Sequence, residues 1–261
     1  MPRPELPPRR SRARVLGKQG APPGPEHARY RSRTERSYEL PRSVLDELSV
    51  ALSGSGDVAT RRPGQARSSR SIESLQRRLT AAAEAYERDR YDEALSTLRP
   101  VIERAPEAAA VKELYGLILY RLGRWRQAAR ELRELYQATG SFDQHPVIAD
   151  CERAMGRQDR VKALWDELRQ AGVDSEVLAE GRLVMAGALA DSGSLDKAIE
   201  LLEPEAKNRK NPSLAHLRQW YALADLYERG GDLQRARQLF ARIAQADSEL
   251  FNAAERLRAL W

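Results

Sequence analysis

Residues 220–240 read WYALADLYERGGDLQRARQLF, and this stretch decides the fold. Its apolar residues recur at three- and four-residue spacing on both sides of Gly231, which is typical of two helices joined by a turn. Glycine can take the left-handed conformation that ends the first helix. Ala236 is small enough for the second helix to approach the first closely, and Phe240 fills the space one turn later. The stretch therefore predicts a helix pair.

The same arrangement recurs through residues 71–261, at intervals of 34, 33, 37 and 38 residues. Each copy pairs a small or branched residue with a large apolar one four positions later: Ala94/Leu98, Ala128/Leu132, Val161/Trp165, Ala198/Leu202 and Ala236/Phe240. Five residues before the small position stand Asp89, Gly123, Gly156, Gly193 and Gly231. No stretch alternates long enough to predict a strand. The predicted fold class is all-α, with about five helix pairs.

Two segments between and after the copies complete this prediction. The residues KNRKNP at 207–212 are interpreted as a lengthened, solvated loop between repeats. Residues 249–261 predict an eleventh helix with Ala253, Leu257 and Leu260 on one face. An open-ended stack of repeats needs such a cap over its final apolar surface, and Trp261 is expected to contribute to it.

The fifth copy resembles the tetratricopeptide repeat, whose signature is Trp-x-x-Leu-Gly-x-x-Tyr followed by Ala-x-x-x-Phe. The matching residues are Trp220, Leu223, Tyr227, Ala236 and Phe240. The third copy departs most, with Glu152 where Tyr is usual and Val161 where Ala is usual, so its helices are expected to pack more loosely. The resemblance covers residues 75–248 and implies an α-solenoid that binds other macromolecules.

Two segments carry a narrower resemblance. PVIADCERAMGR (146–157) and NAAERLRAL (252–260) are similar to segments of uncharacterised actinobacterial tetratricopeptide proteins that also have a basic, proline-rich arm. No enzymatic activity can be inferred from this likeness.

Residues 1–70 form a basic arm that differs in composition from the rest of the chain. They hold 15 Lys and Arg against 7 Asp and Glu, whereas residues 71–261 hold 29 against 31. The arm also has 9 of the 14 prolines and neither Phe nor Trp. So little apolar surface cannot offset an ordering cost of ~1–2 kcal/mol per residue, and the arm is expected to be disordered. A solvated tail and a segment that contacts RNA or DNA phosphates both fit this composition.

One stretch of the arm, PRSVLDELSVAL at 41–52, predicts a short helix over residues 42–52. Ser43 followed by Asp46 resembles a capping box, and Val44, Leu45, Leu48 and Leu52 share one helical face. Two interpretations remain open. The helix rests on the first repeat, or it is a recognition helix for a partner or for the protein's own groove.

The sequence shows no signs of catalysis, of a cofactor site or of a metal site. It has no Walker-type glycine loop, dinucleotide fingerprint, Cys-x-x-Cys pair or His-Glu-x-x-His helix. The single cysteine, Cys151, is expected to be a small buried thiol. No apolar run reaches the roughly 18 residues of a membrane span, and the arginine-rich start does not resemble a secretory signal. A cytoplasmic protein without enzymatic activity is expected.

In tetratricopeptide folds the first helix of each pair lines the concave face, so the resemblance identifies groove residues. They lie off the core side of the predicted first helices: Leu117, Tyr120, Arg121, Asp150, Arg153, Tyr221, Asp225 and Arg229. Mixed charge with two tyrosines suits a peptide held by polar contacts and aromatic anchors, although ordinary surface residues would look alike. Leu79, Ala83, Glu113 and Leu117 stand where chaperone-docking relatives carry a lysine/asparagine clamp, which argues against that role.

The leading hypothesis is an adaptor or scaffold that binds a protein segment along a curved helical groove. The alternative is an RNA- or ribosome-associated factor tethered through the basic arm, and a regulatory sensor is a third hypothesis. The sequence identifies neither the partner nor the oligomeric state.

Overall fold

The computed structural model describes Leu48 and residues 65–207, 209–247 and 250–260. This part consists of α-helices and two short 3₁₀ helices, without a strand. The first helices of five successive pairs are α2 (Gln65–Glu87), α4 (Ala109–Arg121), α6 (His145–Ala154), α8 (Ser175–Asp191) and α10 (Leu214–Arg229). The second helices are α3 (Tyr91–Arg104), α5 (Trp125–Thr139), α7 (Gln158–Gln170), α9 (Leu195–Leu202) and α11 (Leu233–Ala246). The predicted all-α solenoid of five helix pairs is confirmed.

The turn inside each pair has the predicted left-handed residue. The φ angles are +59° at Asp89, +72° at Gly123 and Gly156, +81° at Gly193 and +82° at Gly231. Glycine reaches this region without a steric penalty, and aspartate is one of the side chains that tolerates it. The spacing in the sequence therefore fixed where each first helix ends.

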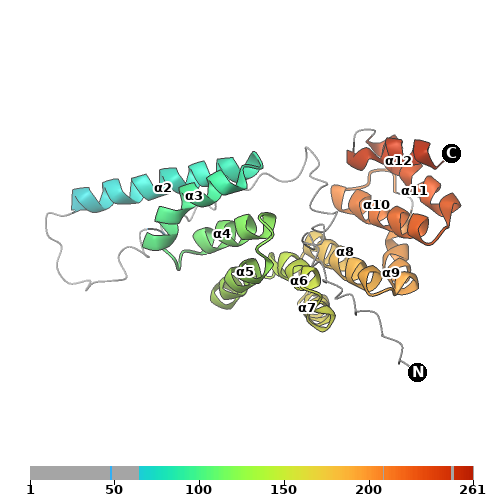
Figure 1. Ribbon diagram of the computed structural model, residues 1–261, viewed down its shortest axis with the longest axis horizontal. Coiled ribbons are helices and arrows are strands. Elements are labelled where there is room, and N and C mark those ends of the chain that lie inside the picture. Colours follow the sequence, from blue (N-terminus) through green and yellow to red (C-terminus); the bar gives the residue numbers. More distant parts are fainter. Residues whose placement is uncertain (1–47, 49–64, 208, 248–249, 261) are drawn as a thin grey trace, which may run out of the picture.

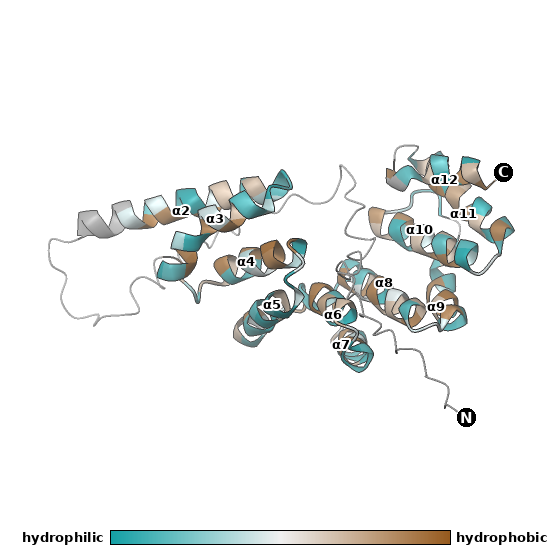
Figure 2. Cartoon of the chain, in the orientation of Figure 1, coloured by the Kyte–Doolittle hydropathy of each residue, from teal (hydrophilic) through white to brown (hydrophobic). Residues whose placement is uncertain are grey.

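The pairs follow a curved path from α2 and α3 at one end to α10 and α11 at the other (Figure 1). Helices α4, α6 and α8 lie on the inner side of the curve, and α5, α7 and α9 lie on the outer side. Hydrophobic and hydrophilic residues alternate along the helices (Figure 2). We call the side of α4, α6, α8 and α10 that points into the curve the inner face.

A chain of overlapping clusters of buried apolar side chains holds the described pairs together. Helix α4 contributes to the clusters on either side of it, and α6 and α8 do the same further along. The cluster between α6 and α8 has the smallest side chains: Ala149, Val161, Val184 and Ala188. Because α4, α6 and α8 each belong to two clusters, burial couples neighbouring repeats in series.

Helices α4 and α5 cross closely because small residues stand at the crossing. Ala128 is fully buried, and a Cβ atom added to Gly116 would lie 2.5 Å from Cδ2 of Leu132. The small residue on α5 and the glycine on α4 therefore allow the close approach that the repeat spacing predicted.

The third pair, α6 and α7, contains a buried carboxylate where the repeat signature has a tyrosine. Glu152 is fully buried and accepts a hydrogen bond from Arg133 of α5. The guanidinium groups of Arg157 and Arg160 lie 3.2 and 3.9 Å from the same carboxylate. Three arginines thus compensate one buried charge, which is what such a charge requires. At position 152, polar contacts therefore take the place of the packing of an aromatic ring.

Both ends of the stack are covered by additional residues. At the C-terminal end, the 3₁₀ helix η3 (Leu250–Asn252) leads into α12 (Ala253–Ala259), and Ala253, Leu257 and Leu260 pack on the last cluster as predicted. Trp261 lies outside the described residues. The 3₁₀ helix η2 (Glu203–Ala206) and a non-helical connection join α9 to α10.

At the N-terminal end, α2 begins at Gln65, so the domain boundary predicted at residue 70 falls inside a helix. Leu48 is helical and fully buried in the cluster formed by α2, α3 and α4. The rest of the helix predicted at 42–52, like most of the basic arm, lies outside the described residues. Within the described part, no helix combines the length and apolar character needed to span a membrane.

Candidate functional site

The residues predicted to line the groove all lie on the first helices α4, α6 and α10. Most of them are not separate surface side chains. The structure joins them into two polar groups, one that links α4, α6 and α8 and one under the C-terminal cap.

The middle group connects three first helices through charged side chains. The Tyr120 hydroxyl of α4 donates to Oδ2 of Asp150 on α6 at 2.5 Å. Arg153, one turn further along α6, donates from Nε to Oδ1 of Asp150 at 2.8 Å and from Nη1 to Oδ2 of Asp191 on α8 at 2.7 Å. A continuous hydrogen-bonded path therefore crosses from the second repeat to the fourth.

Burial makes this path stronger than one on an open surface. Asp150 is buried, and burial together with the Asp150 carboxylate raises the pKa of the Tyr120 phenol well above its ordinary value. The Arg153 guanidinium lies against Gly187 of α8, where an added Cβ would be 3.2 Å from Nη1. The bare backbone of α8 thus provides the space for the arginine.

The second group is organised by Arg256 of α12, a residue that sequence reasoning did not identify. Its guanidinium donates to the hydroxyl of Tyr221 at 3.0 Å, to Asp225 at 2.9 Å and to Glu228 at 2.7 Å. It also lies 5.0 Å from the centre of the Phe240 ring. Tyr221 and Asp225, two of the predicted groove residues, are therefore already bound by the cap.

The three remaining predicted residues have different surroundings. Leu117 is half-buried against the first apolar cluster. Arg121 lies over the ring of Tyr91 at 5.0 Å and 3.5 Å from Asp89, so it bridges the first two repeats. Arg229 is exposed at the end of α10.

A second set of contacts occupies the position that the signature assigns to tryptophan. This position carries Arg78, Lys112, His145, Arg182 and Trp220, at the same intervals as the small residues. In the middle three repeats its side chain contacts a glutamate: Lys112 with Glu134 at 2.9 Å, His145 with Glu167 at 3.4 Å and Arg182 with Glu205 at 3.1 Å. The repeat intervals could have revealed this series, since they apply to every position of the repeat.

The described part of the chain offers neither an activated cysteine nor a cluster of metal ligands. Cys151 is fully buried, and burial raises the pKa of its thiol far above the ordinary value. A thiol held protonated is a poor nucleophile. Among the described residues, no three His, Cys, Asp or Glu side chains converge in a way that could hold a metal ion.

Comparison with known families agrees with this architecture. The sequence profile of the tetratricopeptide repeat family matches residues 79–143 and 183–250. This chain is a tetratricopeptide repeat protein. The two matched ranges leave out α6 and α7, the pair in which Glu152 and its arginines replace the usual packing.

A solved structure of a thermophilic tetratricopeptide protein shows the same fold. The tetratricopeptide protein is similar to a thermophilic TPR protein from Thermus thermophilus, with 19% identity, a TM-score of 0.53, and coverage of 71% of this chain and 98% of the other. It also matches the Pseudomonas aeruginosa protein pilF, with 15% identity, a TM-score of 0.48, and coverage of 72% and 87%. No curated protein sequence matches the chain.

Proposed function

We propose that this tetratricopeptide protein is a non-catalytic scaffold that binds a peptide segment of a protein partner along its inner face. The observation that carries the proposal is the hydrogen-bonded path from Tyr120 through Asp150 and Arg153 to Asp191. This path fixes the relative positions of three first helices. A face that is already ordered loses less conformational entropy when a ligand binds.

The chemistry of the inner face indicates what kind of segment it accepts. Its side chains are of mixed charge, and the arginines and carboxylates of the path are largely paired with each other. A partner segment would therefore add polar contacts at the edges of these pairs. Among the predicted residues Arg229 is exposed and Leu117 is partly exposed, whereas only 15% of the Arg121 side chain is accessible. A cytoplasmic location is part of the same proposal.

Comparative affinity capture from the native host tests this proposal. The full chain, the inner-face variant Arg229→Glu and a matched control, Arg126→Glu, would serve as baits. Arg126 is exposed on the outer helix α5, so both substitutions reverse one exposed charge. A partner of the inner face is retained by the wild type and by the control and is lost with Arg229→Glu.

A second variant addresses the path itself. Tyr120→Phe keeps the ring against Trp125, which lies 5.4 Å away between centroids, and removes only the hydroxyl that donates to Asp150. The captured partner should be reduced with this variant although the chain stays folded at the assay temperature, because the loss of one buried hydrogen bond costs only about 1–3 kcal/mol. Equal capture by all baits contradicts the inner-face proposal. RNA recovered with every bait, and lost on deleting residues 1–36, favours the nucleic-acid alternative.

A further inference from the structure

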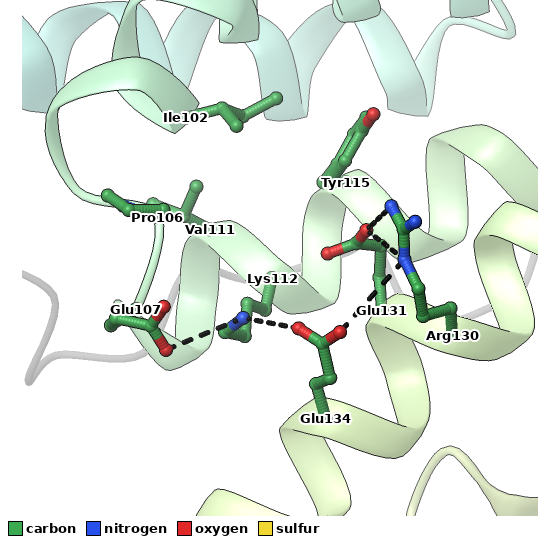
Figure 3. A pocket seen from close by; sticks show the side chains of 9 residues that line it. All are labelled: Ile102, Pro106, Glu107, Val111, Lys112, Tyr115, Arg130, Glu131 and Glu134. Carbon is green, nitrogen blue, oxygen red and sulfur yellow. Dashed lines mark hydrogen bonds and ion pairs between the residues drawn. The ribbon is translucent and has the colours of Figure 1, made fainter.

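A pocket of about 280 Å³ opens between the α3–α4 connection and helix α5, away from the predicted groove residues (Figure 3). One wall is apolar and consists of Ile102, Pro106, Val111 and Tyr115. Since a cavity of about 150 Å³ accepts a benzene ring, this pocket has room for a long side chain.

The opposite wall of the pocket carries an excess of negative charge. Lys112 lies 2.9 Å from Glu134 and 3.5 Å from Glu107, and Arg130 lies 2.7 Å from Glu131 (Figure 3). Both cations are thus paired within the wall, and three carboxylates face two cations. Glu107 at the rim is 82% exposed, so its oxygens can accept further hydrogen bonds.

The fifth repeat shows what closes this space elsewhere in the same protein. There Trp220 takes the place of Lys112, and Leu239 takes the place of Glu131. Both are buried in one apolar cluster, and Nε1 of Trp220 donates to the carbonyl oxygen of Glu205 at 2.9 Å. In the second repeat, charged side chains and an open pocket stand where the fifth repeat has this apolar packing.

An apolar wall opposite carboxylates suits a side chain with a hydrocarbon stem and a cationic head. Arginine and lysine have that form, and the planar guanidinium of arginine can bind carboxylates through two hydrogen bonds. The chain itself supplies such side chains, because residues 9–14 read RRSRAR. An aromatic ligand would leave the excess negative charge uncompensated.

The position of Leu48 places the arm within reach of the pocket. Leu48 is buried in the same cluster as the pocket residue Val111, and Ile102 and Tyr115 pack against that cluster. Leu48 therefore anchors the 47 residues that precede it beside the repeats that form the pocket. An extended chain spans roughly 3.3 Å per residue, so these residues are long enough to reach it. A tether of this kind raises the effective concentration of the arginines at the pocket.

We propose that an arginine of the segment 9–14 docks in this pocket within the same molecule, with its stem against the apolar wall and its guanidinium on Glu107 and Glu131. The arm is then a ligand of its own repeat domain. A basic partner of this pocket has to displace it. This contact is independent of what binds the inner face.

Paramagnetic labelling of the full chain tests the contact. Ser11→Cys introduces a thiol between Arg10 and Arg12, and a spin label can be attached there selectively because Cys151 is fully buried. Backbone amide signals of Ile102, Glu107 and Val111 should lose about half their intensity or more at low salt. In ~0.5 M NaCl, where charges are screened beyond a few ångströms, the signals should recover.

Matched variants make the test specific. Glu107→Gln with Glu131→Gln should abolish the loss of signal, and Glu107→Gln alone, at the exposed rim, should reduce it without affecting folding. Asp196→Asn with Glu200→Gln removes two exposed carboxylates from α9 and should leave the effect intact. The proposal is overturned if the pocket variants behave like this control or if the loss spreads evenly over the surface. It is also overturned if an added arginine peptide perturbs the pocket while the attached arm does not.

Discussion

Lys112 and Glu134 form an ion pair, with 2.9 Å between Nζ and Oε2, at the repeat position that Trp220 fills with an indole ring. Burial opposes the charge on Lys112, but Glu134 and Glu107 outweigh it and raise the pKa of the ammonium group. At the same position His145 carries an imidazole and Arg182 a guanidinium, and each contacts a glutamate. Within each middle repeat a polar contact thus stands where the last repeat relies on apolar packing.

Removing the two partners of the Lys112–Glu134 pair should have unequal effects on stability. Lys112→Met removes a buried charge and keeps the hydrocarbon stem, so the free energy of unfolding should stay within about 1 kcal/mol of wild type. Glu134→Gln leaves the 8%-exposed lysine with only the more distant Glu107 and should cost about 1–2 kcal/mol. Urea denaturation measures both, and a larger loss for Lys112→Met contradicts this account.

Overpacking the crossing of α4 and α5 should destabilise the second repeat. Ala128→Leu inserts three carbon atoms at a fully buried crossing and is expected to cost ~1–3 kcal/mol. Ala138→Leu on the exposed end of the same helix is the control and should change stability little. An unaltered denaturation midpoint for Ala128→Leu argues against the alignment of repeats.

Leu48 should contribute to the stability of the first repeat although it precedes α2 by many residues. Leu48→Ala removes a fully buried side chain and is expected to cost about 2–5 kcal/mol. Leu233→Ala provides the comparison, because Leu233 is 39% exposed. If both variants melt like the wild type, Leu48 is not part of the core in solution.

Arg256 should hold the C-terminal cap on the last repeat. Arg256→Ala leaves Tyr221, Asp225 and Glu228 without this donor, so amides of α12 should exchange with solvent about ten-fold faster or more. Arg258→Ala is the matched control two residues away, since Arg258 donates only to the Ala254 carbonyl of its own helix. Equal exchange rates in the two variants mean that apolar packing alone retains α12.

Stability should decrease on mild acidification because of His145. Burial lowers the pKa of this imidazole below its ordinary value of 6.5, despite Glu167 nearby, and its Nδ1 has no hydrogen-bond partner among the described residues. The unfolded chain therefore binds the proton at a higher pH than the folded chain. The contribution of neutral His145 to the free energy of unfolding is therefore present above pH 6.5. It is lost as the pH falls from there toward the pKa of the folded state.

Urea midpoints measured at pH 7 and about pH 5.5 check this dependence. In His145→Gln the difference between the two midpoints should shrink. His216→Gln is the second variant, because burial and the nearby Arg209 also lower the pKa of His216, so the difference should shrink there as well. An unchanged difference in His145→Gln assigns the acid sensitivity to other groups.

The sequence predicted features that repeat. A left-handed residue followed five positions later by a small one recurs in each copy, and the φ angles at Asp89 and the four glycines agree with that pattern. The cap was predictable for the same reason, because Ala253 and Leu257 share one helical face. The series at the tryptophan position could have been predicted in the same way.

The partners of individual polar residues could not be predicted. Tyr120 and Asp150 are 30 positions apart, and Tyr221 and Arg256 are 35 apart, so no local spacing relates them. Several carboxylates at helical spacing were equally suitable partners for each arginine. The burial of Leu48 could likewise not be predicted, since an apolar helical face can pack on the protein's own repeat or on a partner.

By itself, then, the sequence determined the helix pairs, their turns and their order, because these depend on short-range sterics and on the period of apolar residues. Only the tertiary structure decided which charges meet across neighbouring first helices, that the cap binds Tyr221 and Asp225, and that a pocket opens beside Lys112. Those features depend on how far each pair rotates against the next, and that rotation is fixed by packing between residues distant in the chain.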